Sequence, residues 1–276
     1  MNIRNKPIGI FDSGIGGLTV LKEISRILPN ESIVYFGDTA RVPYGSKSKE
    51  TVIKFSIQDA DFLMDLDVKM IVVACNTASS LSLDILKKRY DIPLVGVIGP
   101  GARKAAEITD KMRVGVIGTK ATVSSGIYEK EVKSFNPRIN VVSASCPLFV
   151  PLVEEGWLTG SITKQIAKTY LEPLKKNNID VLILGCTHYP LLRPVIQDVV
   201  GRRVSLVDSA KETAKEVKRI AEENGMCKNA KDKPMYKFYI SDEPLLFKKV
   251  GEKFLGRSIE NVEKVEIELR GEVCTK

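Results

Sequence analysis

The sequence predicts an α/β fold of two similar domains, each with a mainly parallel sheet, related by pseudo-two-fold symmetry and with the functional site between them. Short apolar runs alternate with amphipathic segments along most of the 276 residues, which is typical of repeated βαβ units. Similar segments also recur: residues 8–12 resemble 114–118 at an offset of 106, and residues 94–97 correspond to 205–208 at an offset of 111. This recurrence indicates an internal duplication.

The first half of the chain supplies the clearest elements. Strands are predicted at residues 8–11, 33–36, 71–75 and 94–97, and helices at about 16–28, 49–66 and 79–89. Each pair of strands is joined by a helix, so the strands are expected to run parallel.

The second half restarts the pattern at residues 114–118, after a Gly-Pro-Gly sequence at 99–101 that favours a hinge-like turn. Beyond Asp208 we expect a helix at about 210–224, a strand at 237–240, a short helix at 244–254 and a possible strand at 262–269. These are too few elements for a third domain. The predicted domains are therefore 1–98 together with 208–276, and 99–207.

Composition excludes several classes of protein. With 43% hydrophobic residues the chain can bury a sizeable core, but no run approaches the ~20 apolar residues of a membrane span. Asp12 interrupts the one early apolar run, so no signal peptide is expected and the predicted location is the cytoplasm. Five cysteines without a C-x-x-C, and a single histidine, argue against disulfides and a metal site. The formal charge of +8 does not come with a nucleic-acid-binding motif, so nucleic acid is not an expected partner.

Two cysteines lie in matching contexts. Cys75 and Cys186 each follow an apolar strand and precede small polar residues, which places both thiols at the edge of a parallel sheet where ligands bind. If the halves face each other, one thiol can approach each side of a substrate, as inversion of a stereocentre by proton transfer requires. A helix N-terminus would stabilise a thiolate, and Asn76, Thr77 and Thr187 suit that position. The other three cysteines are expected to be structural: Cys146, Cys227 and Cys274.

Two further segments are candidates for the site. Residues 12–17, DSGIGG, follow a strand and can present backbone N–H groups to a carboxylate, while Asp12 and Ser13 can anchor an ammonium group. Thr19 breaks the G-x-G-x-x-G pattern, so no dinucleotide is expected; the alternative interpretation is a helix cap formed by Ser13. The loop Pro43, Tyr44, Gly45 can turn N–H groups toward a ligand.

His188 lies two residues beyond Cys186 and can assist proton transfer at that thiol. The alternative for this histidine is a purely structural role.

With these motifs in this order, the chain closely resembles the bacterial glutamate racemases of the cofactor-independent aspartate/glutamate racemase family. The resemblance runs from about residue 7 to 208. It implies glutamate bound between two α/β domains, no cofactor, and supply of D-glutamate for peptidoglycan synthesis. It also implies that Cys75 takes the proton from D-glutamate and Cys186 the one from L-glutamate, with Asp12 and His188 supporting the thiols. The remaining implied substrate contacts are Ser13, Pro43, Tyr44, Gly45, Asn76, Thr77, Thr119, Thr122 and Thr187.

The resemblance leaves some questions open. Either Glu154 or Glu155 corresponds to an acidic position of the family. A racemase for aspartate or another amino acid is the alternative within the family, and a pyridoxal enzyme is the alternative outside it. A homodimer is expected, whereas binding to gyrase is considered only as an added role.

Overall fold

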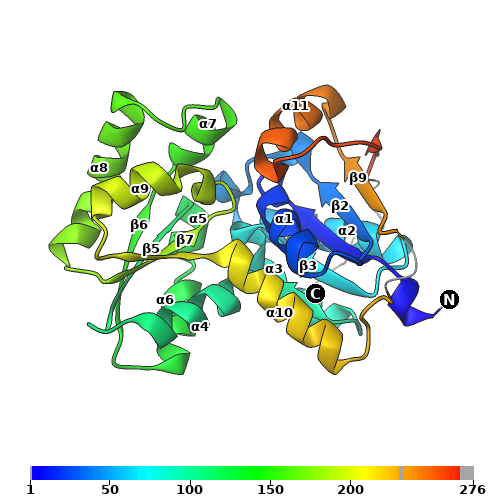
Figure 1. Cartoon of the computed structure of the whole chain (residues 1–276), viewed down its shortest axis with the longest axis horizontal. Helices are drawn as coiled ribbons and strands as arrows, with labels where there is room; N and C mark the ends of the chain where they lie inside the picture. Colours follow the sequence, from blue (N-terminus) through cyan, green and yellow to red (C-terminus); the bar gives the residue numbers. More distant parts are fainter. Residues whose placement is uncertain (1, 230–232, 268–276) are drawn as a thin grey trace.

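The computed structural model describes residues 2–229 and 233–267, and these residues form two sheets in which all neighbouring strands are parallel (Figure 1). One sheet has six strands in the order β10-β9-β2-β1-β3-β4, and the other has four in the order β6-β5-β7-β8. The four-stranded order repeats the β2-β1-β3-β4 part of the larger sheet. The predicted fold class, an α/β protein with two parallel sheets, is confirmed.

The six-stranded sheet contains β1 (Ile8–Asp12), β2 (Ile33–Gly37), β3 (Met70–Val73), β4 (Leu94–Gly96), β9 (Tyr236–Ile240) and β10 (Val262–Lys264). It is covered on both faces, so its central strands are buried throughout, as parallel strands usually are. Side chains alternate between the two layers: Ile8 and Ile10 pack in the cluster of α1 (Leu18–Ile27), whereas Phe11 packs in the cluster of α2 (Lys49–Asp65).

The chain leaves this sheet after β4 and returns to it later. The connection from β8 leads into α10 (Ser209–Glu223), which runs back along α1. After α10, β9 pairs with β2 and β10 pairs with β9, with α11 (Pro244–Leu255) between the two strands.

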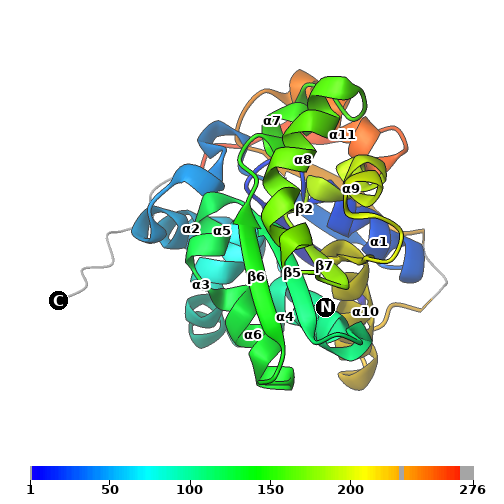
Figure 2. The same cartoon turned by 90° about the vertical axis from the view of Figure 1, so that its left-hand side faces the viewer.

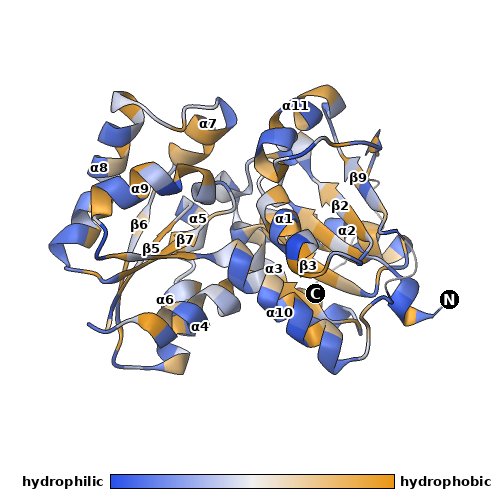
Figure 3. Cartoon of the chain, in the orientation of Figure 1, coloured by the Kyte–Doolittle hydropathy of each residue, from blue (hydrophilic) through white to orange (hydrophobic). Residues whose placement is uncertain are grey.

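The four-stranded sheet contains β5 (Arg113–Gly118), β6 (Asn140–Ser145), β7 (Val181–Gly185) and β8 (Ser205–Asp208). Figure 2 views the molecule from the side of this sheet, with β6 in front. Its helices are α4 (Ile98–Ile108), α5 (Lys120–Ser124), α6 (Ile127–Phe135), α7 (Phe149–Glu154), α8 (Ser161–Lys176) and α9 (Arg193–Val200). The strands are predominantly apolar and the outer helices carry the hydrophilic residues (Figure 3). No helix in the described residues is long and apolar enough to cross a membrane.

The predicted turn at residues 99–101 is wrong, because these residues lie in the first turn of α4. Proline is tolerated there, since the first N–H groups of a helix have no partner within it. Gly101 is needed for close packing: a Cβ at this position would lie 3.2 Å from Ser209 Oγ. Glycine and proline, which normally mark a turn, here mark a helix start and a close helix contact.

Two other boundaries differ from the prediction. The helix expected at 79–89 begins at Asn76, so α3 (Asn76–Arg89) has Cys75 as its N-cap residue. The polar residues of its first turn have low helix propensity and hid the true start. The strand expected at 262–269 ends at Lys264, and its last two residues, 268 and 269, lie outside the described residues.

Candidate active site

The carboxyl ends of strands from both sheets border one cavity. From the six-stranded sheet it is lined by Ser13, Gly14, Ile15, Val42, Pro43, Tyr44, Gly45, Cys75, Asn76 and Thr77. From the other sheet it is lined by Thr119, Val150, Glu154, Cys186, Thr187 and His188. The two thiols predicted to act together therefore line the same cavity from different sheets.

Cys75 closes the end of β3 and caps α3. Its side chain is almost fully buried, and Sγ lies 3.5 Å from Ser13 Oγ. Burial, followed by the neighbouring Asp12 carboxylate, raises the pKa of the Cys75 thiol to about 12. This thiol is therefore protonated at neutral pH while no substrate charge is near it.

Cys186 has a different polar partner. Its Sγ lies 3.9 Å from His188 Nδ1, and His188 Nε2 lies 3.0 Å from Glu154 Oε1. Burial lowers the pKa of His188, but the contacts with Cys186 and Glu154 outweigh it and raise that pKa to about 10. A charged imidazolium can thus stabilise a thiolate at Cys186.

The expectation that Thr187 lies at a helix N-terminus is wrong. Thr187 lies in a turn, and the short 3-10 helix η4 (Tyr189–Leu192) begins two residues later, so no helix begins at Thr187.

The fold places Glu154 and Glu155 differently. Glu154 is the last residue of α7 and contacts His188, whereas Glu155 is exposed beyond the helix end. Consecutive helical residues point about 100° apart, so only one of the two can face the cavity.

Asp12 and Asn76 are buried beside the thiols and each keeps one polar atom unpaired. Asp12 Oδ2 accepts from the Gly14 N–H at 3.0 Å, while Oδ1 has no hydrogen-bond partner among the described residues. Burial raises the pKa of Asp12. Asp12 is not among the residues that line the cavity, and its predicted contact with substrate stays a prediction. Asn76 Oδ1 accepts from the Tyr128 hydroxyl at 2.7 Å, which leaves Nδ2 without a partner in the described chain.

Three threonine hydroxyls join the two sides of the cavity. Thr77 Oγ1 lies 3.0 Å from Thr119 Oγ1 and 3.3 Å from Thr122 Oγ1. Thr122 is buried and lies within hydrogen-bond distance of the other two, and its predicted contact with substrate stays a prediction. Gly45 completes this side: a Cβ there would lie 2.7 Å from Thr119 Cβ, so only glycine allows the loop to approach α5 this closely.

The side chain of Tyr44 has its polar end outside the cavity, and its predicted contact with substrate stays a prediction. Tyr44 lines the cavity, but its ring is buried and its hydroxyl bonds to Asp38 and Asp59, away from the thiols. Its contribution to the cavity is the wall that it forms with Pro43 and Gly45.

Several residues of the site could not be predicted from the sequence. Ile15, Val42 and Val150 are apolar wall residues. Phe254 of α11 packs edge-on against the His188 ring at 5.4 Å between centroids. These contacts join distant parts of the chain, so local patterns carry no trace of them.

Tyr128 provides a test of how the site is ordered. Tyr128→Phe removes the donor to Asn76 Oδ1 and lets the amide rotate, so we expect kcat/KM to fall about tenfold, the equivalent of one net hydrogen bond. Steady-state kinetics measure kcat/KM, and thermal unfolding measures the change in stability. Tyr170→Phe is the matched control, because its hydroxyl bonds to the Leu148 N–H instead of a cavity residue. An unchanged kcat/KM in Tyr128→Phe would contradict this role.

The fold and the site define a class: α/β proteins with a pair of acid–base groups between two parallel sheets. Residues 8–217 match the model of the Asp/Glu/Hydantoin racemase family, and the chain belongs to that family. It is 51% identical over 267 residues to a glutamate racemase of Geobacter metallireducens, covering 97% of this chain and 99% of the relative.

Solved structures show the same similarity. A glutamate racemase from Francisella tularensis in complex with D-glutamate has a TM-score of 0.91 and 43% identity, covering 96% of this chain and 99% of that chain. A glutamate racemase isoform from Bacillus anthracis has a TM-score of 0.92 and 41% identity, with coverage of 96% and 98%.

Proposed function

We infer that this chain is a glutamate racemase, an isomerase that interconverts L- and D-glutamate. The observation that carries this inference is the pair of thiols, Cys75 and Cys186, on one cavity in a chain that is similar over nearly its whole length to glutamate racemases. The related structure with D-glutamate bound supports an amino acid as the small-molecule substrate.

The proposed reaction uses one thiol as base and the other as acid. From D-glutamate, the thiolate of Cys75 removes the Cα proton, and the thiol of Cys186 donates its proton to the opposite face of the resulting carbanion. From L-glutamate the roles exchange. One C–H bond breaks, one forms, and the two sulfurs end with their protonation states exchanged. Solvent then restores the starting state.

The neighbouring groups fit this proposal. His188, held by Glu154, stabilises the Cys186 thiolate. Asp12 lies near Cys75, where a substrate ammonium group would offset its charge. Asn76 Nδ2 is an unpaired donor beside the cavity and suits a substrate carboxylate. The proposed further contacts are Ser13, Thr77, Thr119 and Thr187, with Pro43, Tyr44 and Gly45 as the wall and Thr122 acting through Thr119.

Circular dichroism with each enantiomer of glutamate and of aspartate tests the function. We expect both glutamate enantiomers to approach a racemic mixture and both aspartate enantiomers to react much more slowly. Faster racemisation of aspartate would instead assign the chain to the alternative activity within the family.

Removal of small molecules tests whether the thiols suffice. We expect racemisation to survive exhaustive dialysis, chelators and hydroxylamine, because the two thiols account for both proton transfers without a cofactor. Activity lost on such treatment and restored by pyridoxal phosphate would contradict this expectation.

The proposed setting follows from the activity. We propose that the protein works in the cytoplasm, where it supplies D-glutamate for peptidoglycan synthesis, and that it forms a homodimer, which sedimentation equilibrium can test. We also propose that 1–98 with 208–276, and 99–207, act as two domains that enclose the substrate.

A further inference from the structure

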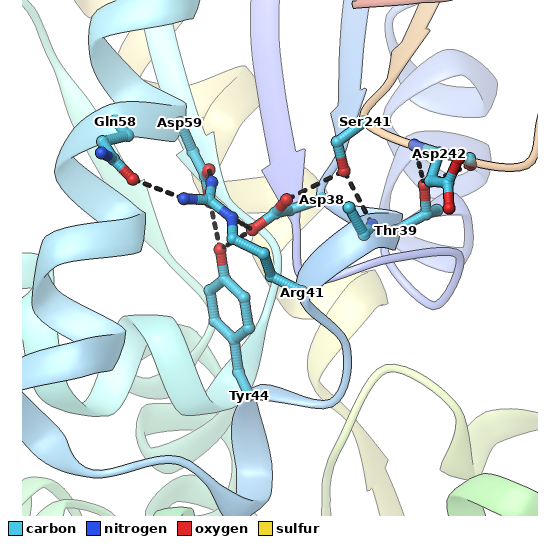
Figure 4. A network of polar contacts seen from close by, with 9 residues as sticks. Asp38, Thr39, Arg41, Tyr44, Gln58, Asp59, Ser241 and Asp242 are labelled. Atoms are coloured by element: carbon cyan, nitrogen blue, oxygen red, sulfur yellow. Dashed lines mark hydrogen bonds and ion pairs between the residues drawn. The ribbon is translucent and has the colours of Figure 1, made fainter. Parts of the chain in front are cut away.

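A buried polar cluster lies behind the wall of Pro43, Tyr44 and Gly45 (Figure 4). It contains Asp38, at the end of β2, and Asp59, in the middle of α2, both without any exposed surface. The hydroxyl of Tyr44 lies between the two carboxyl groups, 2.5 Å from Asp38 Oδ2 and 2.8 Å from Asp59 Oδ2.

The hydrogen atoms at this point can be counted. A tyrosine hydroxyl has one hydrogen to donate, and an ionised carboxylate can only accept. If both aspartates were ionised, one of the two contacts would bring two oxygens together with no hydrogen between them. Two full hydrogen bonds at Tyr44 Oη therefore require a proton on one carboxyl group, which then donates to Tyr44.

The surroundings of Asp38 identify it as the ionised member. Asp38 Oδ2 accepts from Arg41 Nε at 2.6 Å, and Asp38 Oδ1 accepts from Ser241 Oγ at 2.9 Å. The Ser241 hydroxyl is free to donate there, because its oxygen accepts from the Ala40 N–H at 2.8 Å. Every described partner of Asp38 is thus a donor.

Asp59 has one such partner, Arg41 Nη2, 3.0 Å from its Oδ1. Its other oxygen faces Tyr44 and can carry the proton. Burial, followed by the charge of Asp38, raises the pKa of Asp59 well above its usual range. Asp12 adds to this effect, whereas Arg41 and the hydrogen bond with Tyr44 oppose it.

We propose that Asp59 is a protonated positioning residue, which donates to Tyr44 Oη while Tyr44 donates to Asp38. These two consecutive hydrogen bonds fix the 43–45 wall of the substrate cavity. Asp38 and Arg41 then form a neutral pair, and the buried cluster carries no net charge. The wall needs such a support because Gly45 is packed directly against Thr119, so a small displacement changes the cavity.

Asp59→Asn tests the proton itself through stability. An ordinary aspartate has a pKa near ~3.9 when unfolded, so a raised folded pKa contributes stability that is complete below about pH 4 and is lost as the pH rises toward the folded value. Above the unfolded pKa, and for as long as Asp59 keeps its proton in the folded protein, the folded wild type holds one proton more than the unfolded chain. Its unfolding constant should therefore rise, relative to that of Asp59→Asn, by about tenfold per pH unit.

A matched control exists on the same helix. Asp61 accepts hydrogen bonds from the Tyr90 hydroxyl and from Arg89, which are both donors. The unfolding constant of the wild type relative to that of Asp61→Asn should therefore not rise with pH in this way. Denaturant unfolding at pH 5, 6, 7 and 8 gives the constants. Parallel pH profiles for wild type and Asp59→Asn would overturn the proposal.

Kinetics test the positioning role, and this part rests on the proposed racemase function. Asp59→Ala leaves Tyr44 Oη without its donor and should raise KM for glutamate about tenfold with a smaller change in kcat. Asp59→Asn should restore KM, because an amide can donate to Tyr44 and accept from Arg41. Equal KM values in the two variants would refute the positioning role of Asp59. If the unfolding constant rises tenfold per pH unit but the protein is inactive on glutamate, only the proposed racemase function is refuted.

Discussion

Replacing Cys75 or Cys186 by serine is expected to abolish racemisation of glutamate in both directions. Serine has nearly the size of cysteine, but its hydroxyl is far too weak an acid to serve as the base at neutral pH. General acid–base groups typically contribute ~10²–10⁴ in rate, and each of these residues acts as both acid and base. Circular dichroism of D- and L-glutamate measures the loss.

The two variants should differ in one respect. Cys75→Ser keeps the base for L-glutamate, so slow exchange of the Cα hydrogen of L-glutamate with D₂O can survive, whereas Cys186→Ser should keep exchange only for D-glutamate. Cys227→Ser is the control, since Cys227 is half-buried and does not line the cavity. Turnover near the wild-type value in either cavity variant would refute the two-thiol mechanism.

His188→Asn is expected to slow the reaction by ~10²–10⁴, the usual contribution of an assisting acid–base group. The effect should fall mainly on removal of the L-glutamate proton, because His188 Nδ1 is 3.9 Å from Cys186 Sγ and the charged ring stabilises that thiolate. The final ratio of enantiomers cannot change, since a catalyst alters both directions alike.

The asymmetry must therefore be measured in kcat, in KM and in the primary isotope effects with Cα-deuterated D- and L-glutamate. Glu154→Gln is the matched control: it keeps a hydrogen-bond acceptor for His188 Nε2 but removes the charge, so its effect should be smaller. If His188→Asn changes kcat, KM and the isotope effects equally with D- and L-glutamate as substrate, this result would favour a structural role for the histidine.

The sequence was sufficient to predict the parts of the fold that have a local cause. Continuous apolar runs bounded by polar residues located β1, β2 and β7, because strands buried on both faces have this composition. The repeated context of Cys75 and Cys186 indicated that both lie at strand ends. Their common cavity then follows from the two sheets, and the structure shows it.

Features that depend on distant contacts could not be predicted in this way. Gly101 was interpreted as a turn residue because its packing against Ser209, more than a hundred residues away, leaves no local pattern. Tyr44 lines the cavity, but its hydroxyl turns toward Asp38 and Asp59, which no local pattern predicts. Asp59 lies on the helix predicted at about 49–66, and only the fold shows that its side chain is buried.

The most direct test of the two-thiol account is to run the reaction of wild-type protein in D₂O and stop it at low conversion. A thiol carries a single proton, so the one removed from the substrate stays on one sulfur while the product receives a solvent-derived deuteron from the other. Mass spectrometry of the separated enantiomers should show one deuterium at Cα of the product and almost none in the recovered substrate. Product that retains the substrate's own hydrogen, or recovered substrate that is as deuterated as the product, would indicate a single base and contradict the account.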